Sequence, residues 1–266
     1  MRRTAFAALC IVAAAATGLT GCLPGQDRAD AGPGTSGQKP TTSERKTGEN
    51  KEPFAGLTGG QIAERAVKAT AGAASLRITG DVPDDQGGGT IRVDLAMDRK
   101  GECAGTMSAD GEGEARLIKT GDAVYLKYDE EFLRAQSEGE SAAETDATVA
   151  MLAGRWTKMS VTGQDAQDIA AFCDLDTVLS GAQDVDSDAT RGRTTTVDGA
   201  SAIVLSERDG TDRQTLYVAT EGTPYLLRVD STSATDPGSL TFSDYDVPVP
   251  ARKPDGEIVD LDALAG

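Results

Sequence analysis

The sequence predicts an α+β fold whose main part is an antiparallel meander of about ten or eleven short strands. Three observations lead to this prediction. After one amphipathic segment at residues 57–72, apolar and polar side chains alternate in one stretch after another. Short turns rich in Gly and Asp separate these stretches. Two further segments, 129–154 and 165–179, have a helical rather than an alternating character.

The chain begins with a predicted signal peptide, residues 1–21. Arg2 and Arg3 precede a mostly apolar run that is too short to span a bilayer comfortably. The following Leu-Thr-Gly-Cys at 19–22 resembles the lipobox of bacterial lipoproteins. This resemblance implies cleavage before Cys22, a diacylglycerol on its sulfur and retention on the extracytoplasmic face of the cell membrane. An ordinary secretion signal with a chance cysteine is the alternative.

Residues 22–54 are predicted to form a disordered tether. They are rich in Gly, Pro, Ser, Thr, Gln and mixed charge, a composition that cannot offset the entropy of ordering. As a random coil the tether reaches about 30 Å on average. Removal of residues 1–21 takes away two arginines and no acid, which changes the net charge from −17 to −19. Such a charge repels phosphates, so no nucleic-acid partner is expected and acyl chains must hold the protein at the membrane.

The folded part is predicted to begin with a helix at residues 58–71. Thr58 and Gln61 have the spacing of a capping box, in which each side chain accepts a hydrogen bond from the other residue's backbone. Leu57 and Ile62 can form the apolar contact that usually accompanies such a start. Gly72 ends the periodic pattern.

The predicted strands fall into two groups on either side of the helical segments. The first group is expected at 76–78, 91–97, 103–109, 116–120, 123–128 and, with the only tryptophan, 155–159. The second group is expected at 190–197, 201–207, 213–219, 225–231 and 239–245. Prolines after residue 247 end the regular pattern, and the acidic tail 251–266 can add one edge strand.

The four cysteines have separate predicted roles. Cys10 leaves with the signal peptide and Cys22 carries the lipid, so Cys103 and Cys173 remain as a disulfide pair in an exported protein. The chain contains no histidine, which excludes Ser-His-Asp and Cys-His catalysis and leaves two cysteines as too few ligands for a zinc site. No catalytic residue, metal or cofactor is therefore predicted.

Three segments carry a resemblance to a known family. They are Leu-Tyr-Val-Ala at 216–219 with the Gly-Thr-Pro turn and strand at 222–229, Leu-Thr-Phe-Ser-Asp-Tyr at 240–245, and Gly-Asp-Ala-Val-Tyr-Leu-Lys at 121–127. Together they resemble the LppX/LprG family of cell-envelope lipoproteins, which have a LolA-like fold. The resemblance implies one domain at 55–250, in which a strongly curved antiparallel sheet forms an open half-barrel and helices cover its concave face.

In that family the concave face accepts the acyl chains of lipids. The resemblance therefore implies that inward-facing strand residues line a ligand site: Leu76, Ile78, Ile91, Val93, Leu95, Val124, Leu126, Leu216, Val218, Leu227 and Val229. The alternative for each position is plain core packing against the helices. At the level of function, we expect a lipoprotein that binds or carries a lipid or another hydrophobic ligand without catalysis. The alternative is a protein-interaction or sensor-accessory lipoprotein with a closed core and an envelope protein as its partner.

Overall fold

The computed structural model describes residues 52–84, 89–109, 111–162, 164–180, 188–209, 212–232 and 237–264. The predicted signal peptide, Cys22 and nearly all of the predicted tether lie outside these residues. Within the described part, no helix has the length and apolar character needed to cross a membrane.

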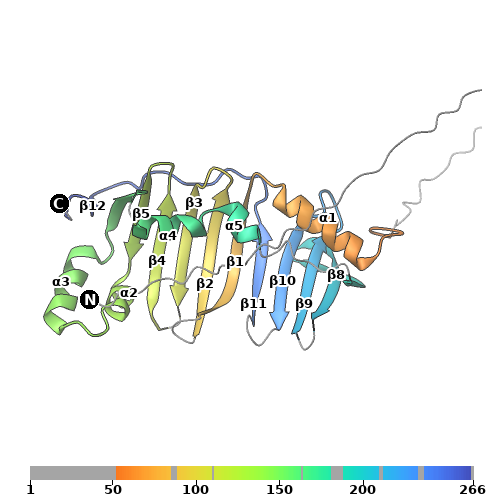
Figure 1. Ribbon diagram of the computed structural model, residues 1–266, viewed down its shortest axis with the longest axis horizontal. Coiled ribbons are helices and arrows are strands. Elements are labelled where there is room, and N and C mark those ends of the chain that lie inside the picture. Colours follow the sequence, from red (N-terminus) through yellow and green to blue (C-terminus); the bar gives the residue numbers. More distant parts are fainter. Residues whose placement is uncertain are drawn as a thin grey trace, which may run out of the picture. The chain divides into compact units, whose positions relative to one another are not determined.

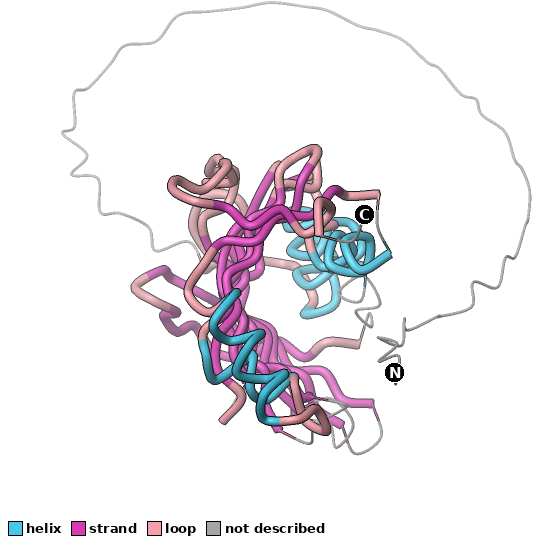
Figure 2. Tube along the Cα trace, turned by 90° about the vertical axis from the view of Figure 1, so that its left-hand side faces the viewer, coloured by secondary structure: helices cyan, strands magenta, loops and turns pink. Residues whose placement is uncertain are grey.

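The described residues contain one open sheet of twelve strands (Figure 1). In chain order the strands are β1 (Ser75–Asp84), β2 (Gly89–Asp98), β3 (Cys103–Ala109), β4 (Gly113–Lys119), β5 (Ala123–Tyr128), β6 (Trp156–Ser160), β7 (Thr190–Val197), β8 (Ala200–Asp209), β9 (Asp212–Ala219), β10 (Leu226–Thr232), β11 (Pro237–Ser243) and β12 (Ile258–Asp260). Their spatial order is β12-β6-β5-β4-β3-β2-β1-β11-β10-β9-β8-β7. The sheet is strongly curved (Figure 2) and not closed, so the predicted α+β fold with a curved, open sheet is confirmed.

Five helices accompany the sheet in the described residues. They are α1 (Gly59–Ala71), α2 (Glu130–Gln136), α3 (Ala142–Leu152), α4 (Gln164–Phe172) and α5 (Leu175–Ser180). In Figure 1, α1 crosses β9 and β10, whereas α4 and α5 cross the strands from β5 to β1. Buried residues of these three helices form one apolar cluster with the strands, which makes this the covered, concave face of the sheet.

Two meanders make up the sheet, and they meet where β1 pairs with β11. Every neighbouring pair is antiparallel except β12 with β6, which is parallel. At the junction Arg77 lies opposite Ser243, 166 residues later in the chain. Besides the eleven strands of the alternating pattern, the sheet contains the three-residue strand β12 at its edge, within the acidic tail in which an edge strand was expected.

The predicted helix at 165–179 is interrupted. Asp174 accepts a hydrogen bond at its Oδ1 from the backbone N–H of Thr177, at 2.9 Å, and so caps a new helix, α5. The segment 129–154 likewise forms two helices, with Asp129 as the N-cap of α2 and Ser141 as the N-cap of α3. Sequence periodicity alone did not reveal these breaks, because aspartate and serine also occur on exposed helix surfaces.

The capping box predicted for α1 is confirmed. The Thr58 hydroxyl accepts a hydrogen bond from the Gln61 backbone N–H at 3.2 Å, and the Gln61 side chain accepts one from the Thr58 N–H at 3.0 Å. The helix buries Ile62, Ala63 and Ala66 completely against the sheet. The small side chains of Ala63 and Ala66 allow α1 to lie close to the strands.

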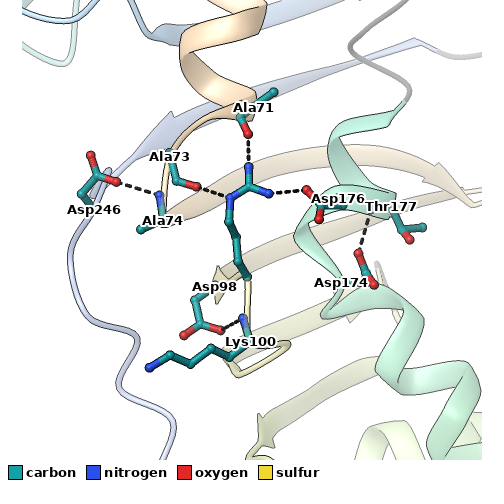
Figure 3. Close-up of polar contacts among 10 residues, drawn as sticks. Ala71, Ala73, Ala74, Asp98, Lys100, Asp174, Asp176, Thr177 and Asp246 are labelled. Carbon is teal, nitrogen blue, oxygen red and sulfur yellow. Dashed lines mark hydrogen bonds and ion pairs between the residues drawn. The ribbon is translucent and has the colours of Figure 1, made fainter.

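A disulfide and an arginine hold α4 and α5 over the concave face. Cys103 on β3 is bonded to Cys173, which directly follows α4, and both are fully buried. Near the C-terminal end of α1, Arg99 Nε donates to the Ala73 carbonyl at 2.8 Å, and Nη1 donates to Asp176 Oδ1 on α5 at 2.5 Å. A further contact joins Arg99 to the Ala71 carbonyl (Figure 3). The arginine thus connects the end of α1 with α5.

Residues 52–54, which precede the predicted domain start at residue 55, are attached to the edge strand β7. Arg191 on the edge strand β7 donates to the carbonyl oxygens of Pro53, at 2.5 Å, and Phe54, at 3.0 Å. Its Nη2 also forms an ion pair with Glu52 at 3.0 Å. The sequence could not show this attachment, because its arginine lies more than a hundred residues away from the segment that it holds.

Gly105 on β3 lies close to the backbone of the neighbouring strand β2. A Cβ added there would overlap the backbone carbonyl oxygen of Asp94 on β2, and neither backbone can move without separating the strands. We expect Gly105→Ala to lower the free energy of unfolding by about 1–3 kcal/mol. Gly121→Ala is the matched control, because a Cβ at Gly121 meets no atom within 4 Å. Urea unfolding of both variants checks this prediction, and equal effects would contradict it.

Candidate functional site

The concave face carries a row of apolar side chains that is fully covered. The strand register places Ile78 opposite both Leu95 and Phe242, and residues directly opposite in a sheet point to the same side. Leu117 extends the row across Gly105. All four side chains are at most 5% exposed. We call Leu117, Leu95, Ile78 and Phe242 the covered row.

The next row on the same face is only partly covered. Gly80 lies opposite Val93 and Leu240, Val93 lies opposite Met107, and Leu240 lies opposite Val229. We call Met107, Val93, Leu240 and Val229 the open row. Each of its four side chains is half-buried. One register position further on, Val82 and Ile91 face each other and are also half-buried.

The convex face of the same strands has a different chemistry. There Arg77 pairs with Asp94 at 2.6 Å, and Arg92 pairs with Asp81 at 3.0 Å. The hydrogen bond from Arg77 to Asp94 is the main cause of the raised pKa of this arginine. One face of β1 and β2 is thus apolar and the other is charged, so an apolar ligand has a single favourable side.

The Lys119 side chain occupies a concave position at the end of β4, opposite Cys103 and Val124. It is 9% exposed, and its Nζ donates to the carbonyl oxygen of Gly101 at 2.5 Å. The apolar stem therefore packs inside, while the ammonium reaches the turn between β2 and β3. This arrangement keeps the charge at the edge of the apolar face.

The residues expected to line a ligand site divide into two groups. Those in the buried core cluster are Leu76, Ile78, Leu95, Val124, Leu126, Leu216 and Val218. For these seven, the packing that the structure shows is ordinary core packing. The half-buried members on the concave face are Ile91, Val93 and Val229, and contact with a ligand stays a prediction for them.

Leu227 lies at an irregularity of β10, so its contact with a ligand stays a prediction. A register shift between Leu226 and Arg228 places Leu226 opposite Val218. Leu226 is 1% exposed and belongs to the core, whereas Leu227 is half-buried. Such a bulge reverses the side on which successive residues point, and simple alternation cannot anticipate it.

Several concave residues were missing from the expected set. Met97, Leu117 and Phe242 are buried in the same cluster, and Met107 and Leu240 pack against it. For three of them, alternation along the strand was the available signal: Met97 follows Leu95 by two positions, and Leu240 and Phe242 alternate along β11. Met107 was harder to identify, because the inward positions of β3 on either side of it are Gly105 and Ala109.

The concave face offers mainly apolar surface. The chain has no histidine, and the residues that the structure describes contain no group of three Cys, Asp or Glu side chains placed to hold a metal ion. The open row supplies apolar surface. Its neighbours Gly80 and Ala115 are small and therefore do not project above it. Such a surface can remove an apolar group from water.

Beside α1, a polar cluster fixes the segment that follows β11. Asp246 accepts hydrogen bonds from the Ala74 backbone N–H at 2.7 Å and from the Tyr225 hydroxyl at 2.8 Å. The Tyr225 ring stacks on Tyr245, with ring centres 3.9 Å apart. The bond from Ala74, followed by that from Tyr225, lowers the pKa of Asp246, whereas burial raises the pKa of Tyr245.

This cluster gives the stability a dependence on acid pH. Because folding lowers the pKa of Asp246, its contribution is present above the ordinary aspartate pKa of about 4 and is lost as pH falls below that value. We expect Asp246→Asn to destabilise the protein at pH 7 and to differ less from wild type near pH 3. Asn tolerates the positive φ of 59° at this position. Urea unfolding at both pH values checks this, and a constant difference would contradict it.

Comparison with solved structures identifies the fold. LprF from Mycobacterium bovis superposes with a TM-score of 0.51 and 16% identity, over 74% of this chain and 97% of that chain. The domain has an LppX/LprG-type fold. The lipoprotein LppX from Mycobacterium tuberculosis matches with a TM-score of 0.44 and 16% identity, over 72% of this chain and 97% of that chain. No protein-family model and no curated protein sequence matches the chain.

In this LppX/LprG-type fold, the half-buried residues lie beyond the rows that α1, α4 and α5 cover. The fold accounts for the curved sheet and for helices on its concave side. At 16% identity the similarity establishes the fold alone. What the concave face binds has to be argued from the side chains of this chain.

Proposed function

We propose that the protein is a lipid-anchored, extracytoplasmic lipoprotein that binds or carries a lipid or another hydrophobic ligand without catalysing a reaction. The observation that carries this proposal is the open row. Met107, Val93, Leu240 and Val229 continue the apolar concave face beyond the covered core while remaining half-buried. An acyl chain laid along them would exclude water from both surfaces.

The hydrophobic effect of a long acyl chain is large enough to give tight binding. Transfer of an acyl chain out of water contributes about 0.8 kcal/mol per buried methylene, so a long chain needs no specific polar contact for tight binding. The ion-paired convex face offers no comparable gain. The headgroup would remain outside the apolar rows, where water and the polar strand ends can solvate it.

The anchor is proposed from the sequence, since Cys22 lies outside the described residues. Metabolic labelling with an alkyne-bearing fatty acid should label the wild-type chain but not Cys22→Ala. The variant should also appear in the soluble or secreted fraction rather than in the membrane fraction. Equal membrane retention of the two proteins would contradict the proposed anchor.

The ligand is tested by native mass spectrometry of a soluble form that begins at Glu52, purified without detergent. This start keeps the contacts of Arg191 with residues 52–54. We expect a reproducible mass increment that matches a lipid recovered by organic extraction of the same sample. A bare polypeptide mass in every preparation would contradict ligand binding by the concave face.

A further inference from the structure

The helix α3 is apolar but contributes nothing to the core. Seven of its eleven residues are Ala, Val, Met or Leu, and these residues occur on all sides of the helix. None of its residues is buried, and Met151 is 43% exposed. A helix with apolar residues all round is ordinarily found inside a protein. Helices of this length are also marginally stable in water without packing.

The contacts of α3 explain how it is held but not why it is apolar. Its start is fixed by a capping box, in which Ser141 and Glu144 exchange hydrogen bonds. Arg134 on α2 forms an ion pair with Asp146 at 3.0 Å. The helix α2 is itself attached to the domain through Leu133, which is buried, and through Phe132, which stacks on Tyr128. Thus α2 presents α3 to the solvent.

The charges around α3 restrict what can bind there. The exposed carboxylates on α2, on α3 and in the loop between them are Glu130, Glu131, Glu138, Glu140, Glu144 and Asp146. Arg134 is the single basic residue in the segment 129–154, and it already pairs with Glu130 and Asp146. An anionic membrane surface would be repelled by this group. A second copy of this chain, with a net charge of −17, would be repelled as well.

We propose that α3 is a docking surface for a partner protein, which contributes a segment with apolar side chains flanked by lysine or arginine. The apolar side chains would cover Val149, Ala150 and Met151 at the end of α3, and the basic residues would meet the acidic group around them. Docking would remove the apolar surface of α3 from water, and the opposite charges would orient the partner. The surface is separate from the open row, so this proposal stands or fails independently of the proposed ligand.

Site-specific photocrosslinking of the full chain in its native cells tests the proposal. Met151 is replaced by benzoylphenylalanine in one variant, and Phe172 in another. Phe172 on α4 is 47% exposed, which makes it a matched control. We expect one discrete protein adduct from position 151 that is absent from position 172. The crosslinked peptide of the partner should contain Lys or Arg next to apolar residues.

A charge reversal then tests the acidic group. Glu138→Lys with Glu140→Lys, in the loop before α3, should reduce the adduct about fivefold or more. Asp255→Lys with Glu257→Lys has the same spacing on the exposed C-terminal segment and should leave the adduct unchanged. The proposal is overturned by an adduct to lipid or to a second copy, by equal or absent adducts at positions 151 and 172, or by equal effects of the two charge reversals.

Discussion

Loss of the Cys103–Cys173 disulfide is expected to lower the free energy of unfolding by about 3–5 kcal/mol. The bond closes a loop of 70 residues, and in the chain-entropy model the unfolded state gains this much freedom when the loop opens. Both cysteines are fully buried, so replacement by alanine adds little new polar burial. The bond also joins α4 to β3. In the protein without this bond, we expect hydrogen exchange to become faster in α4 and α5 before it does so in the rest of the sheet.

Urea unfolding of wild type and of Cys103→Ala with Cys173→Ala measures this effect. The control is a reducing agent, which should shift the unfolding midpoint of wild type toward that of the double variant and leave the double variant unchanged. The prediction would be contradicted if the reducing agent produced two additional free thiols in wild type and left its free energy of unfolding unchanged. That result would mean that Arg99 and the apolar contacts of Leu175 and Leu179 hold α5 by themselves.

A carboxylate in the proposed site should weaken ligand binding strongly. Ile91→Glu places a charge one register position beyond the open row, on the concave side of β2. Its desolvation by an acyl chain is unfavourable, so we expect the affinity for a fluorescent fatty acid to fall about tenfold or more. Because Ile91 is half-buried rather than part of the core, the fold should tolerate the change.

Thr90→Glu is the matched control for that experiment. Thr90 is the neighbour of Ile91 on the same strand, is exposed and points to the opposite face. The new charge and the strand are the same in both variants, and only the side of the sheet differs. We expect the Thr90 variant to keep its affinity within about twofold. Equal losses in both variants would indicate a charge effect rather than contact at the concave face.

The sequence predicted those features that depend on residues close together in the chain. Alternation from Ile91 to Met97 predicted β2, and the spacing of Thr58 and Gln61 predicted the start of α1. The features that were missed depend on distant partners or on single-residue irregularities. The bulge at Leu226, the capping aspartate at Asp174 and the attachment of Glu52 by Arg191 are of this kind.

The same distinction applies to the candidate site. Local alternation identified which side chains share a face, including Ile91, Val93 and Val229. Whether such a side chain is covered depends on where α1, α4 and α5 lie, and their placement follows from tertiary packing. Buried Leu95 and half-buried Val93 are two residues apart and are both simple aliphatic residues in sequence. Only the structure separates core from open surface.

The junction of β1 with β11 has a consequence for the order of folding. Within the meanders, β1 to β5 and β7 to β11 are joined by short connections, whereas Arg77 must find Ser243 across 166 residues. Contacts of such long range form slowly, so the joining of the two halves should be the late step. The open row crosses this junction between Gly80 and Leu240. A newly made chain therefore lacks a continuous open row until β1 has paired with β11. Pulse-labelling hydrogen exchange should accordingly show protection of β3 and β4, and of β8 and β9, before that of β1 and β11.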